Sequence, residues 1–364
     1  MGIADEAKDL ATTMISFYPG PSRVYDYIPK YVKEAHASGI LSMNHRSPEF
    51  MALMKKTVTL LKRKLSIPAG YTILFTSSAT ECWEIVAQSW IQRKSFHVYN
   101  GAFGQKWYDY TNKLKAGATA LPFGRETVLN PGQSVFEGSE NVICITQNET
   151  SNGTQVSNEI IRAIRKGSPE HLIAVDVTSS LAGIKLDFNA ADIWLASVQK
   201  CFGLPAGLGI MICSPNAIAR ARSINNRQFY NNVVLMADMM EKWQTSYTPN
   251  VLGIYLLMRT LGNVDPIATV HRTIESRYES WMKALSKQSA VHHLIANPAV
   301  RSLTVLALEA DEKTIAAIKR SAAAKGFLLG DGYGDLKPTT IRIANFPALL
   351  GREVKSLQKF FAAL

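Results

Sequence analysis

The chain has 364 residues, of which 47% are hydrophobic and 19% are charged, and its formal net charge is +11. This composition excludes a largely disordered protein, and the length allows a large core and two or three domains. The first ten residues are polar and charged, and no run of about 18 apolar residues occurs. We therefore expect a cytoplasmic protein with no signal peptide and no membrane partner.

Charge and cysteine placement bound the possible partners. The basic residues are scattered, and the one cluster, at 55–64, has the apolar spacing of an amphipathic helix with a solvated basic face. This favours a solvated surface over a nucleic-acid site, and the net positive charge suits anionic small molecules. The four cysteines lie in predicted core segments without a CxxC pair, so we expect reduced thiols and no metal site.

In chain order, the predicted elements alternate between helices and strands. A turn rich in proline and glycine at 17–22 precedes several helices, the clearest over 48–64. Seven apolar runs then read as strands, at 71–76, 96–99, 118–121, 141–146, 172–175, 193–196 and 208–213. Helical stretches such as 159–166 lie between them. This alternation predicts a large α/β domain with a mainly parallel, seven-stranded sheet between helices.

The last third of the chain predicts a second domain. After a helical region near 250–260, a long helix over about 264–287 leads to shorter strands at 301–308, 327–330 and 340–344. We expect an N-terminal arm over 1–15 that packs with the small domain, a large domain over 16–258, and a smaller C-terminal α+β domain over 259–364.

Lys200 lies between two predicted buried strands, at the start of a glycine-rich turn. Burying an unpaired ammonium costs several kcal/mol, so this amine should be neutral, paired or covalently used. A Schiff base to an aldehyde cofactor is one such use. Pyridoxal phosphate also needs a carboxylate at its ring nitrogen. Asp176 ends the preceding predicted strand and fits that role, with a turn or helix-cap aspartate as the alternative.

Three further segments are candidates for holding the cofactor. Residues 77–80 (SSAT) begin a predicted helix, where backbone N–H groups and the helix dipole favour a phosphate, although plain N-caps are the alternative. Phe103 follows a strand and could stack on the cofactor ring or fill the core. Thr150 could donate to the ring hydroxyl or to the pyridoxal aspartate, and Gln199 could donate to the phosphate.

Two arginines are candidates for substrate carboxylates. Arg46, in MNHRSPEF (43–50), and Arg342, in TIRIANF (340–346), lie in segments that read as structured. The planar guanidinium binds a carboxylate with two parallel hydrogen bonds. A surface ion pair is the alternative for either side chain.

These segments together resemble the class V aminotransferases of fold type I, and among them the phosphoserine aminotransferases. The resemblance spans nearly the whole chain and follows the family order. Its motifs are FYPGPS (17–22), NHRSPEF (44–50), GAF (101–103), NET (148–150), DVTSS (176–180), QK (199–200) with GLPAGLG (203–209), SYTP (246–249) and IRIANF (341–346).

The resemblance implies a pyridoxal 5'-phosphate enzyme that is a homodimer with shared active sites. It implies transamination between an amino acid and a 2-oxo acid, specifically phosphoserine and 2-oxoglutarate in serine biosynthesis. By position in the motifs, the catalytic residues are Lys200 and Asp176. The cofactor-binding residues are Ser78, Ala79, Thr80, Phe103, Thr150, Asp176, Gln199, Lys200, Tyr247 and Thr248, with Thr248 reaching the other subunit's cofactor phosphate. The substrate-binding residues are Arg342, for the α-carboxylate, and His45 with Arg46, as a second anion-binding pair.

The sequence departs from that pattern at three places. The phosphate turn is SSATE (77–81) without the usual extra glycines, Tyr247 stands where an asparagine is usual, and the His-Arg pair that grips the substrate phosphate is missing from 334–342, although Lys337 is near. Another class V activity, serine or alanine with glyoxylate, is therefore the alternative. A non-catalytic binding protein on this fold and a nucleotide-binding α/β protein are further interpretations, although no GxxxxGK[ST] motif occurs.

Overall fold

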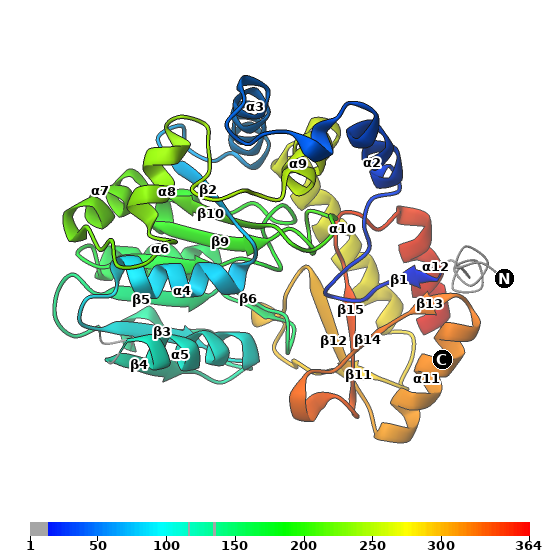
Figure 1. The fold of residues 1–364 in the computed structure, drawn as a ribbon. Helices are drawn as coiled ribbons and strands as arrows, with labels where there is room; N and C mark the ends of the chain where they lie inside the picture. The colour runs from blue at the N-terminus through cyan, green and yellow to red at the C-terminus, as the bar shows by residue number, and fades with distance from the viewer. Residues whose placement is uncertain (1–13, 116, 134–135) are drawn as a thin grey trace.

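The computed structural model describes residues 14–115, 117–133 and 136–364. Most of the predicted arm over 1–15 lies outside the described residues. Within them, Ile15 belongs to the short strand β1 (Ile15–Ser16), which pairs in parallel with β13 (Phe327–Leu328). The beginning of the described chain therefore lies beside the C-terminal third (Figure 1).

A seven-stranded sheet forms the centre of the larger part (Figure 1). Its strands are, in spatial order, β2 (Thr72–Thr76), β10 (Gly209–Cys213), β9 (Ile193–Ser197), β8 (Leu172–Asp176), β5 (Val142–Thr146), β3 (Ser95–Tyr99) and β4 (Ala118–Pro122). All are parallel except β10, which runs antiparallel to both neighbours. The link from β9 to β10 holds no helix, and a parallel crossover usually needs one, so the two strands pair antiparallel.

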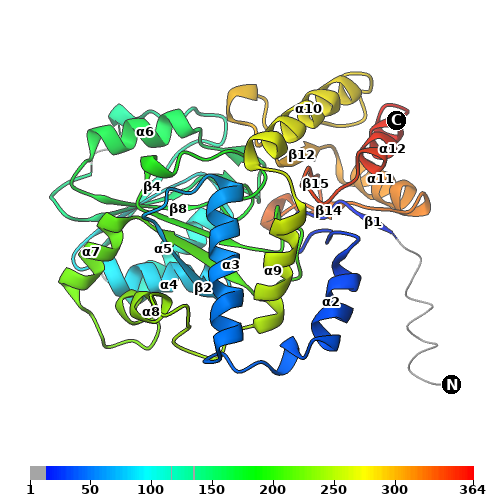
Figure 2. The same ribbon diagram turned by 90° about the horizontal axis from the view of Figure 1, so that it is seen from above.

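Helices cover both faces of this sheet, and Figure 2 shows α6 on one side and α4 with α5 on the other. All the described α-helices of the larger part are, in chain order, α2 (Ile28–Ala37), α3 (Pro48–Leu65), α4 (Ala79–Trp90), α5 (Ala102–Leu114), α6 (Asn158–Gly167), α7 (Pro215–Ile224), α8 (Val233–Met240) and α9 (Val251–Asn263). Short 3-10 helices are η1 (Ile40–Ser42), η2 (Pro131–Gln133) and η3 (Phe188–Ala190), and a two-stranded hairpin joins β6 (Asn148–Glu149) to β7 (Thr154–Gln155).

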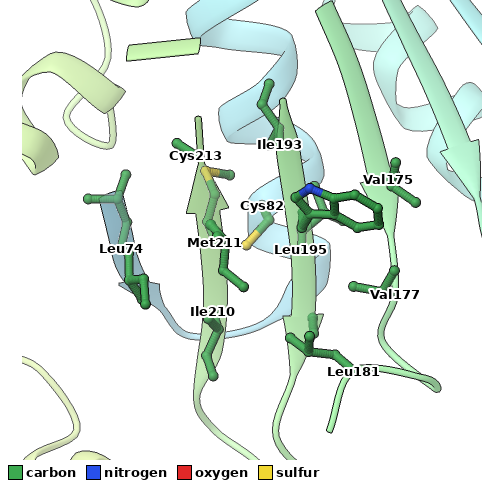
Figure 3. Packing of buried hydrophobic residues seen from close by; sticks show 14 of the residues in the cluster. Leu74, Cys82, Val175, Val177, Leu181, Ile193, Leu195, Ile210, Met211 and Cys213 are labelled. Atoms are coloured by element: carbon green, nitrogen blue, oxygen red, sulfur yellow. The ribbon is translucent and has the colours of Figure 1, made fainter. Parts of the chain in front are cut away.

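The core of the larger part lies between the sheet and its helices. Leu74, Met211 and Leu195 are in register across β2, β10 and β9, and Figure 3 shows Cys82 of α4 packed against this row. Each of these four side chains is at most 1% exposed. Central strands without exposed faces read as continuous apolar runs, which is why their positions could be predicted from the sequence.

The C-terminal third builds a smaller sheet (Figure 1). Its strands are, in order, β11 (His292–His293), β12 (Val305–Glu309), β15 (Thr340–Ala344) and β14 (Gly330–Asp331), and all their pairs are antiparallel. Around it lie α10 (Ile267–Leu285), α11 (Glu312–Ala324), α12 (Gly351–Phe361), η4 (Pro298–Val300) and η5 (Gly334–Leu336). A second cluster of buried apolar residues fills this part.

The predicted fold class, a large α/β unit with a mainly parallel seven-stranded sheet plus a smaller α+β unit, is confirmed. The domain boundaries at 15/16 and 258/259 stay a prediction. The core of the larger part takes in Ile274 of α10, whereas Trp281 of the same helix belongs to the smaller core. Among the residues described, no helix combines the length and the apolar character needed to cross a bilayer.

Candidate functional site

A cavity of about 220 Å³ lies at the carboxyl ends of the parallel strands. Its lining residues end or follow β2, β3, β5, β8 and β9, or come from the segment at 19–21 and from the smaller part. They are Pro19, Gly20, Pro21, Ala79, Thr80, Trp83, Phe103, Thr146, Asn148, Thr150, Asp176, Thr178, Ser197, Gln199, Lys200, Tyr333 and Arg342. This edge is where ligands collect in open α/β sheets.

Lys200 is 8% exposed, and its Nζ donates a hydrogen bond to Oγ1 of Thr150 at 2.6 Å. Burial lowers the pKa of the Lys200 ammonium to about 8, against the opposing pull of the Asp176 and Glu149 carboxylates. A Cβ added at Gly20 would lie 3.0 Å from Cε of Lys200, and the φ of Gly20 is +152°. Because position 20 is glycine, the turn at 17–22 can lie directly against the aliphatic part of the Lys200 side chain.

Asp176 is 5% exposed and lies in the same cavity as Lys200. One carboxylate oxygen, Oδ1, accepts from the backbone N–H of Thr178 at 2.9 Å, and Oδ2 accepts from the indole N–H of Trp83 at 2.8 Å. A carboxylate has about four acceptor positions, so these two donors fix its orientation and leave it able to accept a further N–H.

The start of α4, which follows β2 in the chain, forms one side of the cavity. The side chain of Ser78 caps the helix by accepting from the N–H of Glu81, and the N–H of Ala79 donates to Oγ of Ser197 at 2.7 Å. Thr80 lines the cavity one residue further along. The helix dipole and the hydroxyl of Thr80 thus make this end of the cavity favourable for an anion.

Phe103 lies in the first turn of α5, with the Nζ of Lys200 5.2 Å from its ring centroid. The buried carboxylate of Glu149 holds this turn because Oε2 accepts from the N–H groups of Phe103 and Gly104, each at 3.1 Å. A Cβ on Gly101 would come within 2.4 Å of Cγ of Glu149. Glycine at 101 therefore permits the contact that places the Phe103 ring.

Arg342 is 6% exposed and reaches the cavity from β15. Its Nε donates to the carbonyl of Asp331 at 2.6 Å, and its Nη1 donates to the carbonyl of Thr150 at 2.9 Å. In the described part of the chain, no carboxylate forms an ion pair with it. A buried cation held only by carbonyls, with Nη2 left over, is suited to bind an incoming carboxylate.

The structure brings together in this cavity eight of the residues singled out from the sequence: Ala79, Thr80, Phe103, Thr150, Asp176, Gln199, Lys200 and Arg342. The other five lie elsewhere in the single chain. Ser78 serves as the α4 cap, Tyr247 donates from Oη to the carbonyl of Phe75 at 3.0 Å, and Thr248 is exposed. His45 and Arg46 precede α3, where Nη1 of Arg46 donates to Oε1 of Gln244 at 2.7 Å.

Sequence reasoning missed two aromatic residues that line the cavity, Trp83 and Tyr333. Trp83 lies one helical turn after Ala79, at the spacing of an ordinary amphipathic helix, which gives no sign that its side chain faces a cavity. Tyr333 lies in the loop after β14, with no local pattern to mark it. Across the described residues, no group of three or more histidine, cysteine, aspartate or glutamate side chains could hold a metal ion.

Comparison with known proteins gives a consistent result. Residues 11–332 match the family described as Aminotransferase class-V. A phosphoserine aminotransferase of Corynebacterium glutamicum (strain R) is 29% identical over 350 residues, covering 93% of this chain and 91% of that protein. One from Rhodococcus opacus (strain B4) is 27% identical over 358 residues, covering 93% and 92%.

Solved structures show the same fold. A phosphoserine aminotransferase, SerC, from Cytophaga hutchinsonii superposes with a TM-score of 0.91 at 30% identity, covering 96% of this chain and 99% of that one. An aspartate aminotransferase of subgroup IV from Thermus thermophilus superposes with a TM-score of 0.82 at 19% identity, covering 96% and 98%. The second likeness concerns the fold alone.

Proposed function

The chain belongs to the class-V aminotransferase family, and on this premise we propose that it transfers the amino group of O-phosphoserine to 2-oxoglutarate, as a step of serine biosynthesis. The observation that carries the proposal is the pairing of a buried lysine, of pKa about 8, with a buried carboxylate in one cavity. The similarity to proteins named phosphoserine aminotransferase supports the choice of substrate.

The cavity residues fit pyridoxal 5'-phosphate, the cofactor on which this family depends. Lys200 would bind its aldehyde carbon, Asp176 would accept from its ring nitrogen, and Thr80 with the start of α4 would hold its phosphate. Phe103 would cover one face of the ring, and Gln199 would donate to the phosphate. When bound, the cofactor supplies an electron sink for the pair of electrons left at the substrate α-carbon.

The protein's own groups then have separate tasks. Arg342 binds the α-carboxylate and so orients the α C–H bond toward Lys200. The Lys200 amine, held by Thr150, would accept the α-proton at Nζ and hold it for return, for which a pKa near the working pH is suited. The Asp176 carboxylate, oriented by Thr178 and Trp83, would accept from the ring nitrogen and so favour the protonated ring. Phe103 and Tyr333, whose ring centroids lie 5.0 Å apart, form one wall of the cavity.

Borohydride reduction of the holoprotein tests the proposed attachment. We expect the pyridoxyl group to become fixed to Lys200, because Lys200 is the lysine that lines the described cavity. Peptide mapping by mass spectrometry identifies the modified residue. A label on another lysine, or no label after saturation with the cofactor, contradicts the proposal.

Attachment of the cofactor should depend on pH. The folded-state pKa of Lys200 is about 8, below the usual value for lysine, so its neutral and nucleophilic form predominates above that pH. We expect the rate at which the apoprotein takes up pyridoxal phosphate to rise about tenfold per pH unit below pH 8 and to level off above it. Stopped-flow absorbance measures this rate, and a rise that continues to pH 10 contradicts the lowered pKa.

We propose that the protein works as a homodimer with shared active sites. Support comes from residues that the resemblance assigns to the site but that lie outside the cavity of their own chain: Arg46 and Thr248 are exposed, and His45 lies beside Arg46. Arg46 contacts Gln244, in the segment that leads to Tyr247 and Thr248, so these residues are near one another on the surface. In a dimer, Thr248 would reach the partner's cofactor phosphate, and His45 with Arg46 would bind the substrate's distal anion.

Hybrid dimers distinguish action across the interface from action within a chain. One subunit carries Lys200→Ala and the other carries Arg46→Ala. If Arg46 acts across the interface, the hybrid holds one intact site and regains about half of the native activity per dimer toward O-phosphoserine. If Arg46 acts within its own chain, the only site with a lysine lacks the arginine, and its KM stays raised by about ten- to a hundredfold.

A second candidate is transfer from serine or alanine to glyoxylate, which the missing His-Arg pair in 334–342 favours. The two candidates differ in the amino donors that convert the cofactor to its amino form, a change visible in the absorbance spectrum. Conversion by O-phosphoserine and glutamate supports the first candidate. Conversion by alanine or serine, but by neither acidic donor, supports the second.

A further inference from the structure

We propose that Lys106 and Tyr333 contribute to the binding site for the second acidic group of the substrate, where in the proposed dimer they would act beside the partner's His45 and the partner's Arg46. They stand in for the His-Arg pair that is missing from 334–342. This inference rests on the proposed transamination and names the residues that select acidic donors. Lys106 lies on α5 of the larger part, and Tyr333 lies in the loop that follows β14 of the smaller part.

Tyr333 lies beside the groups that would hold the rest of the substrate. It lines the cavity, and its ring centroid is 5.0 Å from that of Phe103 and 5.7 Å from Cζ of Arg342. An amino acid with its α-carboxylate on Arg342 and its amino group near Lys200 could extend its side chain toward Tyr333, which lines the same cavity. The end of that side chain would then meet the hydroxyl of Tyr333.

The contact between the two side chains leaves donors unused. Nζ of Lys106 donates to Oη of Tyr333 at 2.7 Å. Because the tyrosine oxygen accepts this bond, its own O–H hydrogen stays available to an incoming anion, and the ammonium keeps two further N–H groups. The hydrogen bond to Tyr333 raises the pKa of Lys106, so the side chain is positively charged at neutral pH. A phenol donor and a cation thus lie next to each other at the cavity edge.

The charges around this pair also favour an anion. Lys106 forms no ion pair with any carboxylate of residues 14–115, 117–133 and 136–364. Asp331, two residues before Tyr333, is paired with Lys319 through one carboxylate oxygen, and its other oxygen accepts from Oη of Tyr18. Burial lowers the pKa of Lys319, and the positive charge of Lys337 lowers it further. A phosphate or carboxylate is therefore attracted to Lys106, a cation that Asp331 does not neutralise.

Single-turnover conversion of the bound cofactor by different donors tests the role of each group. In Lys106→Met, we expect the O-phosphoserine concentration for half-maximal conversion to rise about tenfold. This is the effect of losing one charge-assisted hydrogen bond, reduced because solvent screens the exposed Lys106. The value for alanine should change by less than about twofold, because alanine has no second acidic group. Tyr333→Phe keeps the ring against Phe103 and should show the same selective loss of affinity for O-phosphoserine. Lys106→Arg keeps the positive charge and should retain near-native affinity for acidic donors. Lys113→Met, on the same helix, is the matched control.

A binding measurement without turnover separates recognition from catalysis. Glutarate and pentanoate have the same chain length, but only glutarate has a second carboxylate. Calorimetry on the holoenzyme should show that Lys106→Met weakens glutarate binding about tenfold and leaves pentanoate unchanged. An equal effect on both acids, or on O-phosphoserine and alanine, would show a structural role and overturn the inference, as would no effect on either. If the native holoenzyme converts no amino donor at all, the proposed transamination fails and this inference fails with it. Conversion of alanine without any preference for acidic donors overturns only the Lys106–Tyr333 site.

Discussion

Replacing Lys200 with alanine is expected to slow amino-group transfer by about 10⁴-fold, the upper range for loss of a positioned acid–base group. The variant loses both the amine that would attach the cofactor and the group that would move the α-proton. The hydrogen bond to Thr150 is lost as well, but the cavity wall made by Phe103 and Asp176 remains. Single-turnover reaction with an amino donor, followed by absorbance, measures the loss.

The same variant should not be less stable as apoprotein. At pH 7 the folded state must hold a buried Lys200 ammonium whose pKa is about 8, below that of an exposed lysine. The unfolded chain therefore holds the proton more strongly. The resulting penalty on folding is fully present below about pH 8 and fades as pH rises toward the ordinary lysine value. Lys200→Ala removes the penalty, so the Tm at pH 7 should stay the same or rise. Lys166→Ala, which replaces an exposed lysine of α6, is the control for the Tm measurement. Near-native turnover in Lys200→Ala would contradict the catalytic role assigned to Lys200.

The elements of the larger sheet could be predicted because their sequence signals are local. Central strands such as 172–176 and 193–197 are apolar up to their last residues, Asp176 and Ser197, and Lys200 follows the second strand three residues later. Parallel strands bring their carboxyl ends to one edge, so Asp176 and Lys200 could be placed together before any coordinates were known. The helix bounds at 48–65 differ from the predicted ones by a single residue at the end.

Other features depend on contacts that are distant in sequence. Trp83 reaches Asp176, 93 residues further along the chain, and Lys106 reaches Tyr333, 227 residues further along. Neither contact leaves a periodic pattern, because each involves a single side chain that extends from a helix to a segment distant in sequence. In the proposed dimer, the roles of His45, Arg46, Tyr247 and Thr248 would depend on contacts with a second subunit, which are more distant still from any local pattern. The sequence of a single chain could indicate a role for these residues in the site only through resemblance to a family.

Replacing Asp176 with asparagine is expected to lower turnover by about 10²- to 10³-fold, similar to loss of one preorganised electrostatic partner in other enzymes. An amide does not carry the charge that favours a protonated cofactor ring, so the electron sink is weakened. The folded protein is affected too. Both carboxylate oxygens accept now, from Thr178 and from Trp83, and an amide has one oxygen to offer. Its NH₂ group must face one of these N–H donors, which leaves that donor unsatisfied at a cost of about 1–3 kcal/mol.

Two further variants separate the charge effect from the packing effect. Trp83→Phe removes the indole donor but keeps the carboxylate, so it should loosen Asp176 and cost activity less than Asp176→Asn does. Asp187→Asn changes a half-buried aspartate paired with Arg162, outside the cavity, and should leave turnover unchanged. The rate of donor-driven cofactor conversion at saturating cofactor, with unfolding measured in urea for each variant, provides both quantities. Because Asp176→Asn should keep part of its cofactor, its defect should appear in the conversion rate even when every site is filled. Full activity in that variant would remove the carboxylate from the mechanism and leave Asp176 only its contacts with Trp83 and Thr178.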